Sequence, residues 1–331
     1  MRYRTLGSSD LEVSEIALGS WMFFDENTSL EANREVTEAA LDAGITLFDT
    51  ANSYGQGAAE RAWGDILTRF PRDSYVLATK VWGDMPETER GLSADKIAQQ
   101  IDASLSRLRT DHVDLYQAHR FDPEVPIEET IEALLRVVEQ GKARYLGFSE
   151  WTPEQIRAAI DIAGPELFVS SQPQYSMLWQ APEAEVFGLC AENGISQIVW
   201  SPLAQGLLTG KYQPGRPPPE NSRRADEQTS WAMTAIFDEA VVLDAVQRLR
   251  PVAEQAGTDM GTLALAWVLR RSEVAAAIVG ASRPSQVSAN VAASGVELSP
   301  DLLDAIDHAL GDAPVTAPTL APGATEGVRH R

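Results

Sequence analysis

The sequence predicts a single α/β domain folded as a (β/α)8 TIM barrel, with an N-terminal β-hairpin and a long loop excursion between barrel strands 7 and 8. Three observations support this fold class. Short apolar runs alternate with longer amphipathic segments over most of the chain. This βαβα order is typical of parallel sheets, and roughly eight repeats favour closure into a barrel. The 331 residues, 44% of them hydrophobic, suffice for one large barrel core.

Eight short runs dominated by apolar residues are interpreted as buried parallel strands, because strands covered on both faces lack polar alternation. They are residues 16–19, 45–49, 75–80, 113–118, 144–149, 167–172, 195–200 and 275–280.

Segments between these runs carry apolar residues at helical spacing and are predicted to be helices. They include residues 30–43, 93–108, 127–140, 153–162 and 183–193. Start and stop signals agree with these ranges: Ser93 and Thr152-Pro153 stand at helix starts, and Gly44, Gly141 and Gly194 follow helix ends.

Three segments depart from the repeat. Residues 1–13, with Gly7-Ser8-Ser9-Asp10 in the middle, predict a hairpin before the first barrel strand. Residues 212–230 are rich in proline and charge, which favours a loop across the barrel mouth. Residues 313–331 offer little to bury and are expected to form a disordered tail, so the barrel domain spans 1–312.

Composition excludes several functional classes. The 27 basic and 48 acidic residues give a net charge of −21, which argues against nucleic-acid and membrane partners. A lone Cys190 permits no internal disulfide, and the few histidines show no metal-ligand spacing. No signal-like or membrane-spanning apolar run is present. We therefore expect a cytoplasmic protein without a metal, acting on a small molecule, and a homo-oligomer is compatible with the sequence.

Four polar residues, Asp49, Tyr54, Lys80 and His119, follow or end predicted strands, where barrel active sites lie. A free tyrosine is a poor acid at neutral pH, so a proton-donating Tyr54 needs a cation beside it. Lys80 can supply that cation, and Asp49 can keep a buried lysine charged. His119 can hydrogen-bond the substrate oxygen or relay a proton to Tyr54. The four residues predict a centre that protonates a carbonyl during its reduction.

Phosphate recognition is expected at Gly280-Ala281-Ser282-Arg283-Pro284-Ser285-Gln286, which leaves the last strand and enters a helix. Backbone N–H groups, a hydroxyl and Arg283 suit a phosphate monoester such as the 2′-phosphate of NADP. The stretch Gly55-Gln56-Gly57 lacks the third glycine of a dinucleotide-binding turn and is interpreted as the turn that positions Tyr54.

Aromatic residues follow or end several strands and are expected to wall a site for a nicotinamide and an apolar carbonyl compound. Trp200 or Tyr175 is the predicted stacking platform. The predicted substrate pocket consists of Trp21, Tyr54, Trp82, His119 and Trp151. Since side chains alternate along an extended segment, Arg120 is expected to point outward when His119 points inward. Aromatic or medium-length aldehydes are then expected to be preferred to phosphorylated sugars.

The chain resembles the aldo-keto reductase superfamily, in particular the branch of potassium-channel β subunits and their bacterial relatives. The resemblance runs over nearly the whole chain. It is carried by Phe48-Asp49-Thr50-Ala51-Asn52-Ser53-Tyr54-Gly55, Ala78-Thr79-Lys80, Val113-Asp114-Leu115-Tyr116-Gln117-Ala118-His119-Arg120, Trp200-Ser201-Pro202-Leu203-Ala204 and Gly280-Ala281-Ser282, among others.

The resemblance implies a barrel that binds NADP(H) without a Rossmann domain, with Tyr54 as general acid supported by Lys80, Asp49 and His119. It implies that Ser149 and Gln172 hold the carboxamide and that Arg223 clamps the cofactor, with Arg224 as the alternative. The full set implied to bind the cofactor is Gly19, Ser20, Trp21, Asp49, Ser149, Gln172, Trp200, Ser201, Pro202, Leu203, Ala204, Gly206, Lys211, Arg223, Gly280, Ser282, Arg283, Gln286 and Asn290.

Two departures from relatives stand out: Ala289 replaces a common glutamate, and His119 stands where channel β subunits typically carry asparagine. The leading function is NADPH-dependent reduction of aldehydes or ketones. A ketoreductase of a nucleotide-linked deoxysugar uses the same centre and stays open. A cofactor-sensing regulatory subunit is the third hypothesis.

Overall fold

The computed structural model describes residues 1–22, 24, 28–220, 222–227, 229–230 and 240–321. Within these ranges eight parallel strands close into a barrel in the order β10-β3-β4-β5-β6-β7-β8-β9, which confirms the predicted fold class. The strands are β3 (Ile16–Gly19), β4 (Leu47–Asp49), β5 (Val76–Val81), β6 (Val113–Ala118), β7 (Ala143–Phe148), β8 (Ser170–Ser171), β9 (Ser196–Val199) and β10 (Val274–Val279). Only β8 is much shorter than its apolar run predicted.

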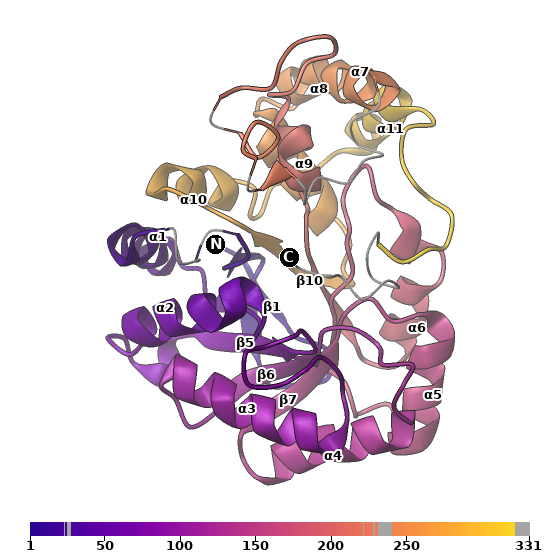
Figure 1. Ribbon diagram of the computed structural model, residues 1–331. Coiled ribbons are helices and arrows are strands. Elements are labelled where there is room, and N and C mark those ends of the chain that lie inside the picture. Colours follow the sequence, from indigo (N-terminus) through magenta and orange to yellow (C-terminus); the bar gives the residue numbers. More distant parts are fainter. Residues whose placement is uncertain (23, 25–27, 221, 228, 231–239, 322–331) are drawn as a thin grey trace.

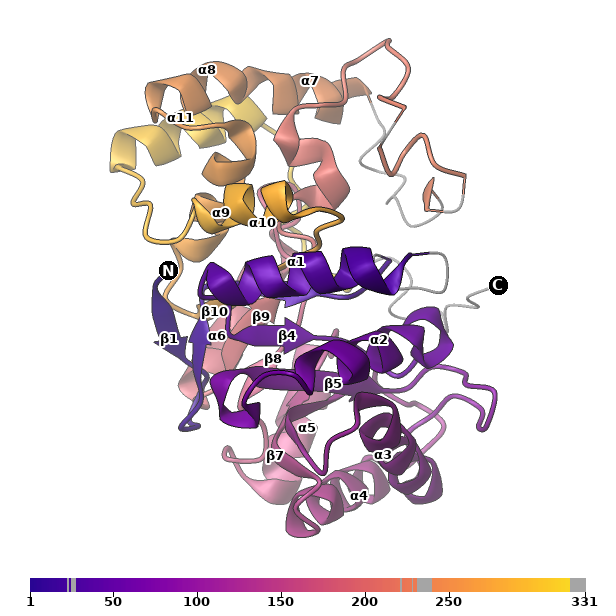
Figure 2. The same ribbon diagram turned by 90° about the vertical axis from the view of Figure 1, so that its left-hand side faces the viewer.

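Helices surround the barrel, and α7, α8 and α11 gather at one side of it (Figures 1 and 2). The α-helices are α1 (Leu30–Asp42), α2 (Ala58–Leu67), α3 (Ala94–Leu108), α4 (Ile127–Glu139), α5 (Pro153–Ala163), α6 (Val186–Glu192), α7 (Ala240–Arg248), α8 (Arg250–Gln255), α9 (Met260–Leu269), α10 (Pro284–Val291) and α11 (Pro300–Leu310). Short 3-10 segments are η1 (Tyr54–Gly57), η2 (Arg72–Ser74), η3 (Ala181–Glu183) and η4 (Ala204–Thr209). None of the helices described combines the length and the apolarity that a membrane span requires.

One of the two helix starts predicted from capping residues has the expected side-chain cap. Thr152 forms a capping box with Gln155, in which each side chain bonds the other residue's backbone N–H. Ser93 stands at the N-cap of α3 but its side chain makes no capping bond, and Glu129 Oε1 accepts the N–H of Ala94 at the first helical position.

The predicted N-terminal hairpin is present as β1 (Tyr3–Thr5) and β2 (Glu12–Ser14), which pair antiparallel. Its side chains Leu6, Leu11 and Val13 are buried against the inward-facing barrel residues, among them Leu47 and Leu115. The hairpin therefore closes the N-terminal end of the barrel. In Figure 2 it lies at the left end, and the described part of the loop after η4 projects at the upper right.

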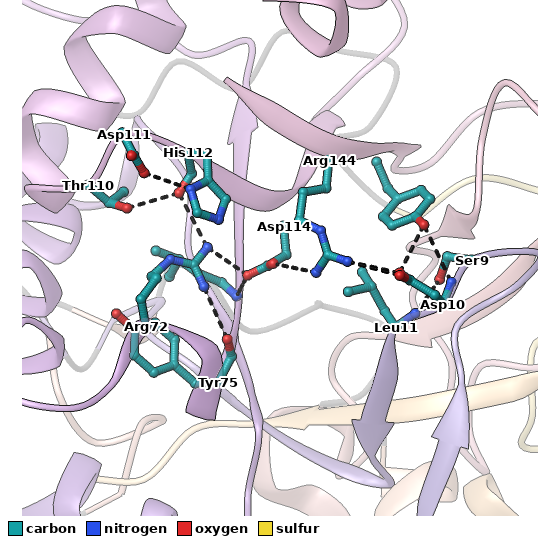
Figure 3. A network of polar contacts seen from close by, with 12 residues as sticks. Ser9, Asp10, Leu11, Arg72, Tyr75, Thr110, Asp111, His112, Asp114 and Arg144 are labelled. Atoms are coloured by element: carbon teal, nitrogen blue, oxygen red, sulfur yellow. Dashed lines mark hydrogen bonds and ion pairs between the residues drawn. The ribbon is translucent and has the colours of Figure 1, made fainter. Parts of the chain in front are cut away.

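An ion network fastens this closed end (Figure 3). The buried Asp114 in β6 pairs with Arg72 at 2.7 Å and with Arg144 at 3.0 Å. Arg144 continues to Asp10 of the hairpin at 2.9 Å, and Tyr145 donates to the same carboxylate. The network ties the hairpin turn to strands β6 and β7.

The alternation of side chains along the strands decides which residues point into the barrel at its C-terminal end. Phe48 in β4 points outward and packs on Trp63 of α2, with ring centroids 5.6 Å apart, while Leu47 faces the barrel interior. Because side chains alternate along a strand, Asp49 also faces inward, one layer above Leu47. The same step in β5 brings Lys80 above Ala78. Polar residues thus form the last inward layer.

The segment after α11 differs from the expected disordered tail. Val315 exchanges backbone hydrogen bonds with the 178–180 segment, and the buried Ala321 donates its N–H to Glu150 at 2.9 Å. Residues 313–321 therefore pack on the barrel. Composition missed this because the contacts use backbone groups, which carry no sequence signal. The rest of the predicted tail, 322–331, lies outside the described residues.

Candidate active site

A cavity of about 1600 Å³ opens at the C-terminal end of the barrel. Its wall comes from the loops that follow the strands, including Tyr54 after β4, Trp82 after β5 and His119 after β6. Glu220, Ser222 and Arg223 of the later loop and helix α10 complete it. Active sites of barrels of this type lie at this end. The volume exceeds what a single drug-sized ligand requires.

The four residues predicted to act together do meet at the inner end of this cavity. Lys80 Nζ donates to Asp49 Oδ2 at 2.6 Å and to the Thr50 carbonyl at 2.8 Å, and it lies 3.4 Å from Tyr54 Oη. The rings of Tyr54 and His119 stand edge to face with centroids 5.7 Å apart. Lys80 is fully buried behind Tyr54, so the phenol faces the cavity and the ammonium does not.

A tight turn presents Tyr54. After Tyr54 the backbone takes positive φ at Gly55 (53°), Gln56 (47°) and Gly57 (83°), and α2 begins immediately afterwards. A Cβ at Gly57 would lie 2.6 Å from Cδ of Arg107, so this position admits only glycine without rearrangement. The Gly-Gln-Gly stretch thus shapes the tyrosine turn, as the sequence indicated.

Two amides complete the shell around Asp49. Its Oδ1 accepts from Gln172 Nε2 at 2.9 Å and from Gln117 Nε2 at 3.3 Å. Gln172 was assigned to the cofactor site, and it also lines the cavity. Gln117 was not predicted, although its position two residues after the inward Leu115 of β6 carried the signal.

Burial and charge act in opposite directions on the central pair. Burial lowers the pKa of the Lys80 ammonium, but Asp49 and Tyr54 outweigh it and the pKa ends above its ordinary value. Burial raises the pKa of the Tyr54 phenol, while Lys80 and, more weakly, Arg120 draw it back. At neutral pH Lys80 is therefore a cation and Tyr54 holds its proton.

Of the aromatic residues assigned to the substrate pocket, Trp21, Tyr54 and Trp82 line the cavity, as does His119. Trp21 lies over Tyr54 with ring centroids 6.4 Å apart.

Two aromatic predictions are wrong. Trp151 is 1% exposed and packs on Phe121, Phe148 and Phe168, because the chain turns at Glu150 with φ of 56° and directs the indole behind the wall. Tyr175 is fully buried and stacks on Trp267. Of the two candidate stacking platforms only Trp200 reaches the cavity.

Most residues implied to bind a cofactor share this one cavity. Its wall includes Gly19, Trp21, Asp49, Ser149, Gln172, Trp200, Ser201, Pro202, Leu203, Gly206, Lys211, Arg223, Gly280, Ser282, Arg283, Gln286 and Asn290. Ser20 and Ala204 are the exceptions. Both are fully buried behind the wall, and Ser20 Oγ donates to Thr50 Oγ1 at 2.8 Å. Their side chains therefore support the site from behind.

The doubled arginine of the long loop divides between two environments. Arg223 lines the cavity, with its guanidinium carbon 5.6 Å from the Trp21 ring centroid, and Arg224 is not part of the wall. Burial lowers the pKa of Arg223 from its ordinary value. Arg223 is thus the loop arginine that can reach a cavity ligand.

The start of α10 forms the far end of the cavity. Gln286 Oε1 accepts from the N–H of Ser282 at 2.7 Å and from its hydroxyl at 3.1 Å. Arg283 occupies the N-cap position and its Nε donates to Ser285 Oγ at 3.1 Å. Ala289, the departure noted above, also lines this end. Hydroxyl, amide N–H and guanidinium groups thus gather at this end of the cavity, with both Ser282 donors bonded to Gln286.

Arg120 corrects a prediction. It was expected to point outward, yet it lines the cavity beside His119. Strict alternation failed because β6 ends at Ala118 and the chain bends at residues 119–120, so successive side chains need not face opposite ways there.

Glu150 is a buried acid that the sequence did not single out. Its Oε1 accepts from the indole Nε1 of Trp200 at 3.1 Å and from the N–H of Gln174 at 2.6 Å. Burial raises the pKa of this carboxyl, which Arg120 and the bound N–H groups oppose. Glu150 therefore fixes the Trp200 ring from behind the cavity.

Among the residues that the structure describes, no group of three or more His, Cys, Asp or Glu side chains is arranged to hold a metal ion.

Comparisons with known proteins agree with this architecture. Residues 15–310 match the model of the aldo/keto reductase family. The chain is 35% identical over 326 residues to a probable voltage-gated potassium channel subunit beta of Arabidopsis thaliana, covering 95% of this chain and 98% of that protein. It is 38% identical over 326 residues to a putative subunit beta of Schizosaccharomyces pombe, covering 95% and 94%. The solved glycerol dehydrogenase of Gluconobacter oxydans superimposes with a TM-score of 0.80 at 27% identity, over 96% of this chain and 98% of that one. The chain therefore belongs to the aldo/keto reductase family, a family of oxidoreductases.

Proposed function

We propose that this protein reduces aldehydes or ketones to alcohols with NADPH, and that Tyr54 donates the proton. The observation that carries the proposal is the contact of Lys80 Nζ with Asp49 at 2.6 Å and with Tyr54 Oη at 3.4 Å, directly behind the Tyr54 wall of a large cavity. An ammonium beside a phenol stabilises the phenolate that proton donation leaves behind.

The cavity suits a dinucleotide. Ser149, Gln172 and Trp200 contribute hydroxyl, amide and indole groups to its wall, while Ser282 and Arg283 lie at the start of α10. Lys211, Arg223 and Arg283 line this cavity and offer cationic partners for an anionic ligand in a chain whose net charge is −21. Once bound, NADPH would supply the hydride for the reduction.

The protein's own residues would divide the remaining work. Tyr54 gives its proton to the carbonyl oxygen, and Lys80, held charged by Asp49, stabilises the phenolate. His119 stands at the edge of the Tyr54 ring and hydrogen-bonds the carbonyl. Trp21 and Trp82 provide flat walls that exclude water.

Preference for NADPH over NADH would come from Arg283, with Ser282 beside it. A phosphate monoester gains charge-assisted hydrogen bonds that a ribose hydroxyl cannot replace. Arg223, near Trp21, is better placed to hold the central part of the cofactor than its far end.

A cofactor-sensing role is the second candidate, favoured by the channel-subunit names of the relatives above. The two functions differ in turnover. Purified protein should consume NADPH, followed at its absorbance band, with members of a panel of aryl aldehydes, dicarbonyls and keto-sugars. Tight NADPH binding with negligible turnover of every carbonyl in the panel would favour sensing and contradict the reductase. A clear preference for keto-sugar nucleotides would identify the deoxysugar ketoreductase.

A further inference from the structure

Arg120 is a cation at the reaction centre that the proposed mechanism does not use. Its guanidinium lies on the cavity wall, next in sequence to His119. Nη1 donates to the His119 carbonyl at 2.6 Å and approaches Ser149 Oγ at 3.4 Å. Within the part of the chain that the structure describes, these are its hydrogen bonds, and no carboxylate forms an ion pair with it. Its Nε and Nη2 donors are left for the cavity.

The nearest acid does not take up these donors. Glu150 acts on Arg120 through charge, but its two oxygens accept from the backbone N–H of Gln174, the indole N–H of Trp200 and the backbone N–H of Ala321. These three bonds occupy the carboxylate at 2.6 to 3.1 Å. Glu150 therefore helps to keep Arg120 charged without binding it.

Two further acids on this part of the wall, Asp84 and Asp122, are engaged with backbone. Asp84 accepts from the N–H of Arg90, and Asp122 accepts from the N–H groups of Leu92 and Glu124. Their roles in holding the 84–92 and 122–124 loops explain their presence without a cationic ligand.

A guanidinium withdrawn from water is costly unless an anion or strong acceptors satisfy its planar fork. Here desolvation outweighs the favourable charges of Glu150 and Tyr54 and lowers the pKa of Arg120 from its ordinary value. A carboxylate or phosphate on the ligand is the partner that such a fork prefers, and it is bound more strongly than a neutral group.

We propose that Arg120 binds an anionic substituent of the substrate, so that the preferred substrates are carbonyl compounds bearing a carboxylate or a phosphate. This inference rests on the proposed reductase function and specifies its substrate class. It reverses the expectation of apolar aldehydes, which depended on an outward-pointing Arg120. Trp82 and Phe121 on the same wall would then pack on the carbon skeleton between carbonyl and anion.

The test compares matched substrates that differ in charge. Succinate semialdehyde is set against its methyl ester, and phosphorylated glyceraldehyde against free glyceraldehyde, each with NADPH. In the unmodified protein kcat/KM should be higher for at least one anionic member, and which pair shows it tells carboxylate from phosphate. Arg120→Met should lower the anion-to-neutral ratio about 10- to 100-fold, and Arg120→Lys should retain part of it. Arg136→Met, on the exposed face of α4, removes a cation elsewhere and should leave the ratio unchanged.

Several results would overturn the inference. Arg120→Met could leave the anion-to-neutral ratio of kcat/KM unchanged. Alternatively, kcat/KM for both substrates of a pair and the affinity for NADPH could fall by one common factor, which would assign Arg120 to the cofactor. Because a buried substitution can unfold the chain, the unmodified protein supplies a second measurement. Succinate or inorganic phosphate should inhibit reduction of the neutral ester competitively, and absence of inhibition by both contradicts the inference. Absence of NADPH turnover with every member of both pairs would instead count against the reductase function itself.

Discussion

Replacing Lys80 with methionine tests the central ion pair, because methionine keeps most of the side-chain length and removes the charge together with its N–H donors. Lys80 is fully buried, and its ammonium lies 2.6 Å from a carboxylate that is itself 4% exposed. Removing one partner of a buried pair leaves an uncompensated charge, at a cost of about 3–5 kcal/mol. Gln172 and Gln117 still donate to Asp49 Oδ1, so we expect about 3 kcal/mol, the lower end of this range.

The same substitution has a catalytic effect with a definite sign. Lys80 lowers the pKa of Tyr54 against the larger effect of burial, so its loss raises that pKa further. Reduction requires protonated Tyr54, and the rate falls as pH rises through its pKa. In Lys80→Met the alkaline limb of the pH–rate profile should move to higher pH, while kcat at neutral pH falls at least ~100-fold because the phenol is a weaker acid.

Urea unfolding and steady-state NADPH oxidation measure the two effects separately. The double variant Lys80→Met/Asp49→Asn also removes the unpaired charge of Asp49, so it should recover more than half of the lost free energy of unfolding without recovering kcat. The reasoning would be refuted if Lys80→Met lost less than about 1 kcal/mol or left the pH profile in place.

Two further variants test the ends of the barrel. Arg283→Ala should weaken NADPH binding by about one to two decades and leave NADH binding nearly unchanged in fluorescence titrations, and equal losses would move the phosphate site elsewhere. Asp114→Asn, which breaks the pairs with Arg72 and Arg144 at 2.7 and 3.0 Å, should lower the free energy of unfolding by about 1–3 kcal/mol with kcat unchanged, whereas an unaltered unfolding curve would show that this network contributes nothing.

Much of the fold was predictable because parallel barrel strands are buried on both faces and appear as apolar runs. All eight runs correspond to strands. The least accurate prediction is 167–172, of which only Ser170–Ser171 forms a strand, because only these two residues pair with the neighbouring strands. Asp49 and Lys80 were predicted to meet because strand ends of a barrel converge, and the structure brings them to 2.6 Å.

The errors share a physical origin in segments beyond the strand ends. The alternation of side chains predicts which way a residue points only inside a strand. It therefore misplaced Arg120 after β6 and could not place Trp151 after the turn at Glu150. Composition likewise predicted a disordered tail, although Val315 and Ala321 attach through backbone groups. Loop geometry depends on tertiary contacts that local pattern does not contain.

The most direct test of the account is single-turnover reduction by Tyr54→Phe. In the described structure the phenol oxygen makes one hydrogen bond, the 3.4 Å contact with Lys80, so phenylalanine should leave stability and NADPH affinity nearly unchanged. If Tyr54 is the proton donor, the rate of NADPH oxidation with bound carbonyl falls at least ~100-fold. A Tyr54→Phe variant that binds NADPH and reduces the carbonyl at the rate of the unmodified protein would contradict the proposed mechanism.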